Sequence, residues 1–180
     1  MRGRKMEYYE LSQSKKVENP IELMGLDPNT YCYAMAKKDF EALDKIKVAY
    51  FSGNEAEEVC DILINPTFMV SDRLKNLIAL YDKETEFKGI QLFPTSEGSK
   101  QYPIYWVPSF PEINCIHERS KIYDNGMVSS LVLNEQRIGR RNIFRLSGLL
   151  EYKIVVSLPM VESILRRRLY GVELIKLEVV

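Results

Sequence analysis

Two stretches of the chain place apolar residues at helical spacing directly after a Val-Ser pair. After Ser71, the side chains at positions 74, 77, 78 and 81 fall at i, i+3, i+4 and i+7, the spacing of one helical face. The stretch 157–170 begins with Ser157, carries a proline in its first turn and is followed by Gly171. The pattern predicts two helices, each with one face on a core.

Short apolar and alternating runs predict strands along much of the remaining chain. Phe40, Leu43 and Ile46 have helix-like intervals and suggest a third helix. The elements together predict an α+β fold with mixed, mostly antiparallel sheets and two or three helices. The predicted strands lie within residues 6–12, 48–54, 88–94, 101–111, 129–135, 142–148, 152–157 and 172–180.

Proline and glycine refine two of these elements. Pro103 and Pro108 cannot donate ladder hydrogen bonds, so the strand within 101–111 is predicted to be an edge strand or to contain a bulge. Asn125 and Gly126 form a preferred pair for a tight turn with positive φ.

The two helical stretches belong to a longer repeat. The Val-Ser pairs at 70–71 and 156–157 each open a helix, and after each helix a glycine, Gly89 or Gly171, begins an apolar strand. A serine hydroxyl at a helix start accepts a hydrogen bond from an unpaired N–H group, which stabilises the helix by about 1 kcal/mol. The sequence therefore predicts a strand, serine-capped helix and strand unit that is used twice.

Length and composition are those of a globular protein. A chain of 180 residues suits one domain, and its 46% apolar and 28% charged content is ordinary. We expect residues 1–60 to form a strand- and loop-rich region that packs on an α+β domain of residues 61–180. Cys32, Cys60 and Cys115 are few and widely spaced, which favours buried, reduced and inert thiols.

Charge and hydropathy argue against several classes of partner. Basic and acidic residues balance at 25 each, so no overall basic field favours nucleic acid. The basic first 16 residues lack the apolar core of a secretory signal. No stretch approaches the roughly 20 apolar residues that span a bilayer. The sequence predicts a cytoplasmic protein with neither a nucleic-acid nor a membrane partner.

No complete catalytic or metal-binding motif is present. A nucleophilic Ser71 would need a base and oxyanion donors, but Ser71 is outside any GxSxG motif and His117 is the one histidine. In a strand, Cys115 and His117 would share a face, but a zinc site needs further ligands. We predict a capping role for Ser71, with no catalytic residue, metal or cofactor.

Charged and aromatic runs remain as candidate binding surfaces. The acidic residues of 54–61 are interpreted as a solvated face, a metal cluster or a docking surface for a basic partner, of which docking is preferred over metal. The arginines could grip phosphate, although those near a helix end also suit the helix dipole. The aromatic run suits a core better than a binding patch. These residues are Glu55, Glu57, Glu58 and Asp61; Arg137, Arg140, Arg141 and Arg166 to Arg168; and Tyr102, Tyr105, Trp106 and Phe110.

From about residue 60 to its C-terminus, the chain resembles the immunity-eleven (immunity MXAN-type) family of bacterial polymorphic toxin systems. The resemblance rests on an order of blocks: "FMVSDRLKNLI", "GIQLFP", "YPIYWVPSFPEINCIHERS", "LVLNEQRIGRRNIFRLSG", "KIVVSLPMVESILRRR" and "YGVELIKLEV". It implies a non-enzymatic cytosolic antidote that binds and blocks a cognate toxin encoded nearby.

Three other functions stay open. A small-ligand or regulatory binding domain would show a deep apolar pocket with a few converging polar groups. An enzyme would bring His117 or the acids of 54–61 together in a cleft. A nucleic-acid binder would show a steep salt dependence.

Overall fold

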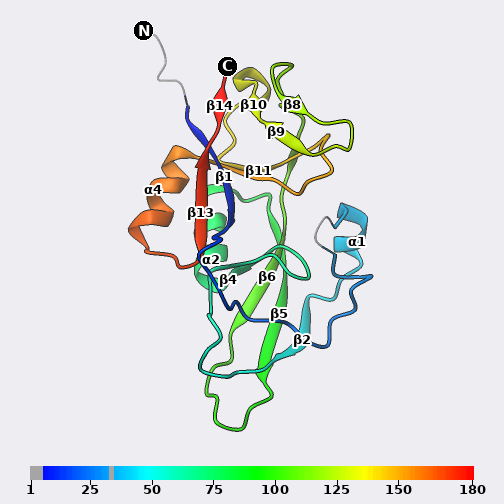
Figure 1. Cartoon of the computed structure of the whole chain (residues 1–180), viewed down its shortest axis with the longest axis vertical. Coiled ribbons are helices and arrows are strands. Elements are labelled where there is room, and N and C mark those ends of the chain that lie inside the picture. Colours follow the sequence, from blue (N-terminus) through cyan, green and yellow to red (C-terminus); the bar gives the residue numbers. More distant parts are fainter. Residues whose placement is uncertain (1–5, 33–34) are drawn as a thin grey trace.

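The computed structural model describes residues 6–32 and 35–180, so the basic residues 1–5 lie outside it. Within the described residues, four helices are interspersed among the strands (Figure 1). Two helices are long, as the sequence predicts, and two are single turns. The helices are α1 (Lys37–Glu41), α2 (Asp72–Tyr81), α3 (Glu135–Ile138) and α4 (Leu158–Arg166).

Two five-stranded sheets organise the described residues. The first has the order β13-β1-β12-β11-β7 and the second β2-β5-β6-β4-β3, and most neighbouring strands in them are antiparallel. These strands are β1 (Tyr8–Gln13), β2 (Ile46–Phe51), β3 (Ile62–Leu63), β4 (Met69–Ser71), β5 (Glu86–Pro94), β6 (Ile104–Ser109), β7 (Glu112–Ile113), β11 (Ile143–Leu146), β12 (Ile154–Ser157) and β13 (Val172–Lys176). The α+β class is therefore confirmed.

Two small pairs complete the fold. They are β8 (Lys121–Ile122) with β9 (Val128–Ser130), and β10 (Val132–Leu133) with β14 (Glu178–Val179). The first pair is a hairpin that turns at Gly126, whose φ is +78° and whose N–H donates to the carbonyl of Tyr123 at 2.8 Å. The predicted tight turn is confirmed.

The predicted repeat is present, with one antiparallel strand inserted in each copy. In the first copy β4 leads through α2 to β5, and β6 lies between the two strands. In the second copy β12 leads through α4 to β13, and β1 lies between them. Each copy is thus a split strand-helix-strand unit within its own sheet, with its two repeat strands parallel to each other.

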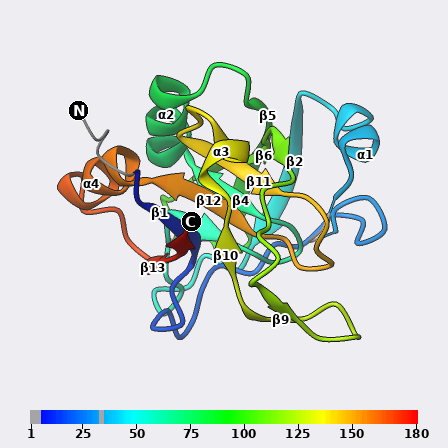
Figure 2. The ribbon, with the colours of Figure 1, turned by 90° about the horizontal axis from the view of Figure 1, so that it is seen from above.

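The two units pack against each other through their helices. Figure 2 shows α2 and α4 as neighbours, and the hydroxyl of Tyr81 contacts both the carbonyl of Pro159 and the hydroxyl of Ser163, at 2.9 and 2.6 Å. The apolar faces of both helices enter one core with side chains from both sheets. They contribute Leu74, Leu77 and Ile78 from α2 and Met160, Val161 and Ile164 from α4.

The N-terminal residues are part of this architecture. Strand β1 lies inside the first sheet between β12 and β13 (Figure 2). Ile21, Tyr31, Met35 and Phe40 pack into a second core, which also contains Ala49 and other residues of the second sheet. Residues from before position 60 therefore supply a central strand and much of one core.

The prediction of an edge strand or a bulge is wrong for β6, whose pairing with β5 is continuous from Ile104 to Ser109. Strand β6 lies between β5 and β4, in the middle of the second sheet. Pro103 precedes the strand, and Pro108 lies beyond the segment that pairs with β4, which ends at the pair of Val70 with Trp106. A central strand can contain this proline because its neighbour on one side is too short to reach it.

Replacing Gly171 tests how closely α4 and β13 approach the second sheet. Gly171 has φ +72°, and an added Cβ would lie 2.5 Å from Cβ of Cys60. We expect Gly171→Ala to lower the free energy of unfolding by roughly 2 to 4 kcal/mol, because it adds backbone strain to a clash. Gly98→Ala is the control, because its Cβ would meet nothing within 4 Å. Urea denaturation that shows equal stability for both variants would contradict this packing.

Candidate functional site

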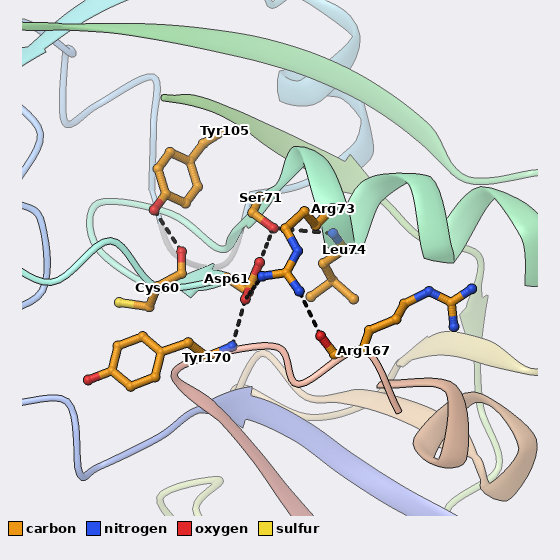
Figure 3. Close-up of polar contacts among 8 residues, drawn as sticks. All are labelled: Cys60, Asp61, Ser71, Arg73, Leu74, Tyr105, Arg167 and Tyr170. Atoms are coloured by element: carbon orange, nitrogen blue, oxygen red, sulfur yellow. Dashed lines mark hydrogen bonds and ion pairs between the residues drawn. The ribbon is translucent and has the colours of Figure 1, made fainter. Parts of the chain in front are cut away.

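Asp61 is a buried carboxylate that joins the two repeat units. Asp61 directly precedes β3 in the chain, and the residue is only 5% exposed. One carboxylate oxygen accepts a hydrogen bond from the Ser71 hydroxyl at 2.5 Å, and the other accepts from the backbone N–H of Tyr170 at 2.6 Å (Figure 3). Tyr170 lies in the loop between α4 and β13. A single side chain therefore connects the start of α2 to the end of the second unit.

The side chain of Arg73 and a backbone hydrogen bond reinforce this junction. Nη1 of Arg73 lies 3.7 Å from the Asp61 carboxylate, and its Nη2 donates to the carbonyl of Arg167 at 2.6 Å (Figure 3). The backbone N–H of Asp61 also donates to the carbonyl of Tyr170 at 2.8 Å. A buried charge is tolerated only when it is paired and hydrogen-bonded, and here it is both.

Ser71 is the N-cap of α2, as the sequence predicts. Its hydroxyl oxygen accepts a hydrogen bond from the N–H of Leu74 at 3.2 Å, while its proton goes to Asp61. His117 lies elsewhere, where its Nδ1 accepts from the backbone N–H of Arg119. The structure thus gives Ser71 a capping role and brings no histidine to it.

Ser157 takes the equivalent place but does not cap α4 through its side chain, which corrects the prediction. Its hydroxyl instead contacts Oδ1 of Asn142 at 2.7 Å. Pro159 lacks an N–H group, and the N–H of Leu158 already donates to the carbonyl of Glu7, so fewer donors need a cap.

The same serine contact recurs in both units. Ser71 bonds Asp61 through both side chain and backbone, and Ser157 does the same with Asn142, the two backbone bonds each measuring 2.9 Å. The repeat predicted from the sequence did not include this contact. An Asp or Asn followed by Ile occurs at 61–62 and again at 142–143, and that shared pair could have extended the repeat.

The acidic run does not converge on one point. Glu57 accepts from the N–H of Gly53, and Glu58 accepts from the backbone N–H groups of residues 18 and 19 and from the Tyr170 hydroxyl. Donation by Tyr170 is the main cause that lowers the pKa of Glu58. Asp61 is buried, which leaves Glu55 as an exposed acid of the run. Among the described residues, no three His, Cys, Asp or Glu side chains are placed to hold a metal.

The arginines and the aromatic residues singled out in the sequence differ in burial and in their contacts. Arg141 forms a salt bridge with Glu84 at 2.5 Å, and the arginines from 166 to 168 are exposed at the end of α4. Tyr105 and Phe110 are buried, as predicted for core residues, but Tyr102 is 57% exposed. The four aromatic side chains therefore do not act as one group.

The thiol prediction is wrong for one cysteine. Cys32 is exposed, whereas Cys60 and Cys115 are buried. Burial raises the pKa of each buried thiol to about 11, so both stay protonated at neutral pH.

A pocket of about 550 Å³ lies between α1, the ends of β5 and β6, and the first sheet. Arg145 lines it, with Nη1 bonded to the carbonyl of Met35 and to Glu112, each at 3.0 Å, and with its guanidinium 4.5 Å from the ring centre of Tyr152. Its Nε is buried without a hydrogen-bond partner among the described residues. Carboxylates of Glu84, Glu86 and Glu112 also line the pocket, beside apolar side chains such as those of Phe40 and Phe110.

The outer face of the second sheet carries exposed apolar side chains. Alternate residues of β2 point outward, and their neighbours on β5 and before β6 extend the same surface. We call this the β2 face; it consists of Ile46 (57% exposed), Val48 (46%), Tyr50 (47%), Phe93 (39%) and Tyr102 (57%). The rings of Phe93 and Tyr102 contact edge to face at 5.8 Å. A contiguous exposed apolar surface of this kind is typical of an interaction site.

The family of the chain follows from its sequence as a whole. A model of the immunity protein family Imm11 matches residues 16–179. The chain belongs to the Imm11 immunity protein family. The match begins well before residue 60, so the N-terminal core residues Ile21, Tyr31, Met35 and Phe40 fall within the family region, whereas strand β1 precedes it. A comparison with curated proteins finds no match. None of the helices in the described residues is long and apolar enough to cross a membrane.

Removing the Asp61 carboxylate should destabilise the whole fold. In Asp61→Ala the N–H of Tyr170 and the hydroxyl of Ser71 lose their acceptor at a buried position, so we expect a loss of about 2 to 4 kcal/mol in the free energy of unfolding. Asp124→Ala, at an exposed turn, is the control and should change it by less than about 0.5 kcal/mol. Chemical denaturation distinguishes the two. An Asp61→Ala variant as stable as the control would show that the junction does not hold the units together.

Proposed function

We propose that this Imm11 protein is a non-enzymatic, cytoplasmic immunity protein that binds and neutralises a cognate bacterial toxin encoded by a neighbouring gene. The observation that carries the proposal is the family match across residues 16–179. An antidote of this kind works by occupying a surface that the toxin needs, so its essential property is a complementary binding face.

The exposed surface of the second sheet supports this proposal. The β2 face presents apolar side chains to solvent, and aromatic residues such as Tyr50 and Tyr102 are enriched where proteins bind one another. The acidic residue Glu55 lies in the loop that follows β2 and remains a candidate for contacting a basic toxin surface. Glu57 and Glu58 remain candidates as well, although Glu57 also bonds the N–H of Gly53 and Glu58 those of residues 18 and 19. Buried Asp61 is better suited to a structural role.

Coexpression with the toxin tests the proposal. The toxin domain encoded beside this chain should arrest bacterial growth when expressed alone, and growth should return when this chain is expressed with it. A toxin from an unrelated system, expressed with this chain, is the specificity control and should stay lethal. A cognate toxin that remains lethal and unbound in the presence of this folded chain would refute the proposal.

A titration separates binding from catalysis. If neutralisation is a binding event, toxin activity in vitro should fall linearly with added chain and vanish near one equivalent. Loss of activity at far lower ratios would reveal an enzyme and would contradict the non-enzymatic part of the proposal.

A further inference from the structure

Strand β2 forms one edge of the second sheet, and half of its backbone groups point away from that sheet. The carbonyl of Phe51 accepts a hydrogen bond from the N–H of Thr95, which directly follows β5, at 2.8 Å. Successive residues of a strand alternate in direction. The N–H and C=O groups of Ile46, Val48 and Tyr50 therefore point toward the outer edge.

Only one of these three outward residues is bonded to the described chain. Tyr50 exchanges two backbone hydrogen bonds with Met24, at 2.9 and 2.7 Å, in an isolated bridge. Gly25 follows with φ +86°, and the pairing does not continue. Ile46 and Val48 have no backbone hydrogen-bond partner among the described residues. Their side chains are exposed on the β2 face.

The charges of β2 argue against a second copy of the chain on this edge. An antiparallel pairing of two β2 strands through both Ile46 and Val48 would place Lys47 directly opposite Lys47 of the other copy. Like charges in opposed positions destabilise a strand pair. Lys45 and Lys47 are exposed and form no salt bridge with the described residues. An acidic residue on the added strand would be complementary at this position.

We propose that an extended segment of the toxin adds to the edge of β2 as a further strand. Its backbone bonds Ile46 and Val48, its apolar side chains extend the β2 face, and an acidic side chain lies opposite Lys47. Strand addition of this kind obtains affinity from main-chain hydrogen bonds and specificity from alternate side chains. The inference rests on the proposed function, because it names the toxin as the partner.

Val48→Pro is the most direct test, since it removes an N–H group that the fold does not use. The probe is the purified toxin domain from the neighbouring gene, titrated calorimetrically into the full chain. We expect Val48→Pro to bind at least about tenfold more weakly, because a toxin carbonyl loses its donor. Val48→Thr keeps the N–H and the branched shape, and should bind within about threefold of the unmodified chain.

Two further variants leave the backbone of β2 unchanged, so that a loss of binding cannot come from altered strand geometry. Lys47→Glu should weaken binding by reversing the complementary charge, and Ile46→Glu by placing a charge on the apolar face. Leu165→Glu, at a 63% exposed position on α4, is the matched control and should bind normally. Circular dichroism confirms that each variant is folded.

The outcomes separate this inference from the proposed function. Weak binding by the three β2 variants, with normal binding by Val48→Thr and Leu165→Glu, supports strand addition. Tight binding by all variants overturns strand addition and leaves the immunity function standing. Absence of any complex with the unmodified chain overturns both. Dimerisation through β2 would be detected by the mass of the chain in solution and would be abolished by Val48→Pro. That result also overturns the toxin as the occupant of this edge.

Discussion

The buried carboxylate of Asp61 is the constraint on which the arrangement of the two units depends. It accepts hydrogen bonds from the start of α2 and from the loop after α4, and so fixes one strand-helix-strand unit against the other. The close approach of Gly171 to Cys60 follows from the same contact. With the helices packed on each other, the interior faces of both sheets are filled. The outer part of the second sheet is left exposed.

Local pattern was enough to predict the two long helices, the longer strands and the repeat. The helix predicted from Phe40, Leu43 and Ile46 is only the single turn α1, and Ile46 instead begins β2. The helical spacing after Ser71 gave α2 with its cap, and the matching Val-Ser pairs gave the second unit. Long-range pairing could not be obtained in this way. Nothing local in residues 8–13 indicates that β1 inserts between β12 and β13, and the position of β6 depends on how far β4 extends. The prolines of the β6 stretch therefore favoured a position at the edge of the sheet, whereas the structure places β6 in its middle.

The candidate binding surface was hidden in the sequence for a related reason. Strand β2 is apolar on both faces, because Ala49 and Phe51 are buried while Val48 and Tyr50 are exposed. Such a run looks like a strand buried on both sides. The acidic run stood out by charge, yet the structure uses Glu57, Glu58 and Asp61 to hold loops. Which apolar face of a strand stays exposed depends on the tertiary structure.

Amide hydrogen exchange by NMR, with the chain free and bound to its toxin, shows whether the edge of β2 gains a strand in the complex. The N–H groups of Lys47 and Ala49 face β5 and should exchange slowly in both states. Those of Ile46 and Val48 should exchange rapidly in the free chain and become protected in the complex, because the added strand bonds them. A complex in which Ile46 and Val48 remain as fast as in the free chain would contradict the account.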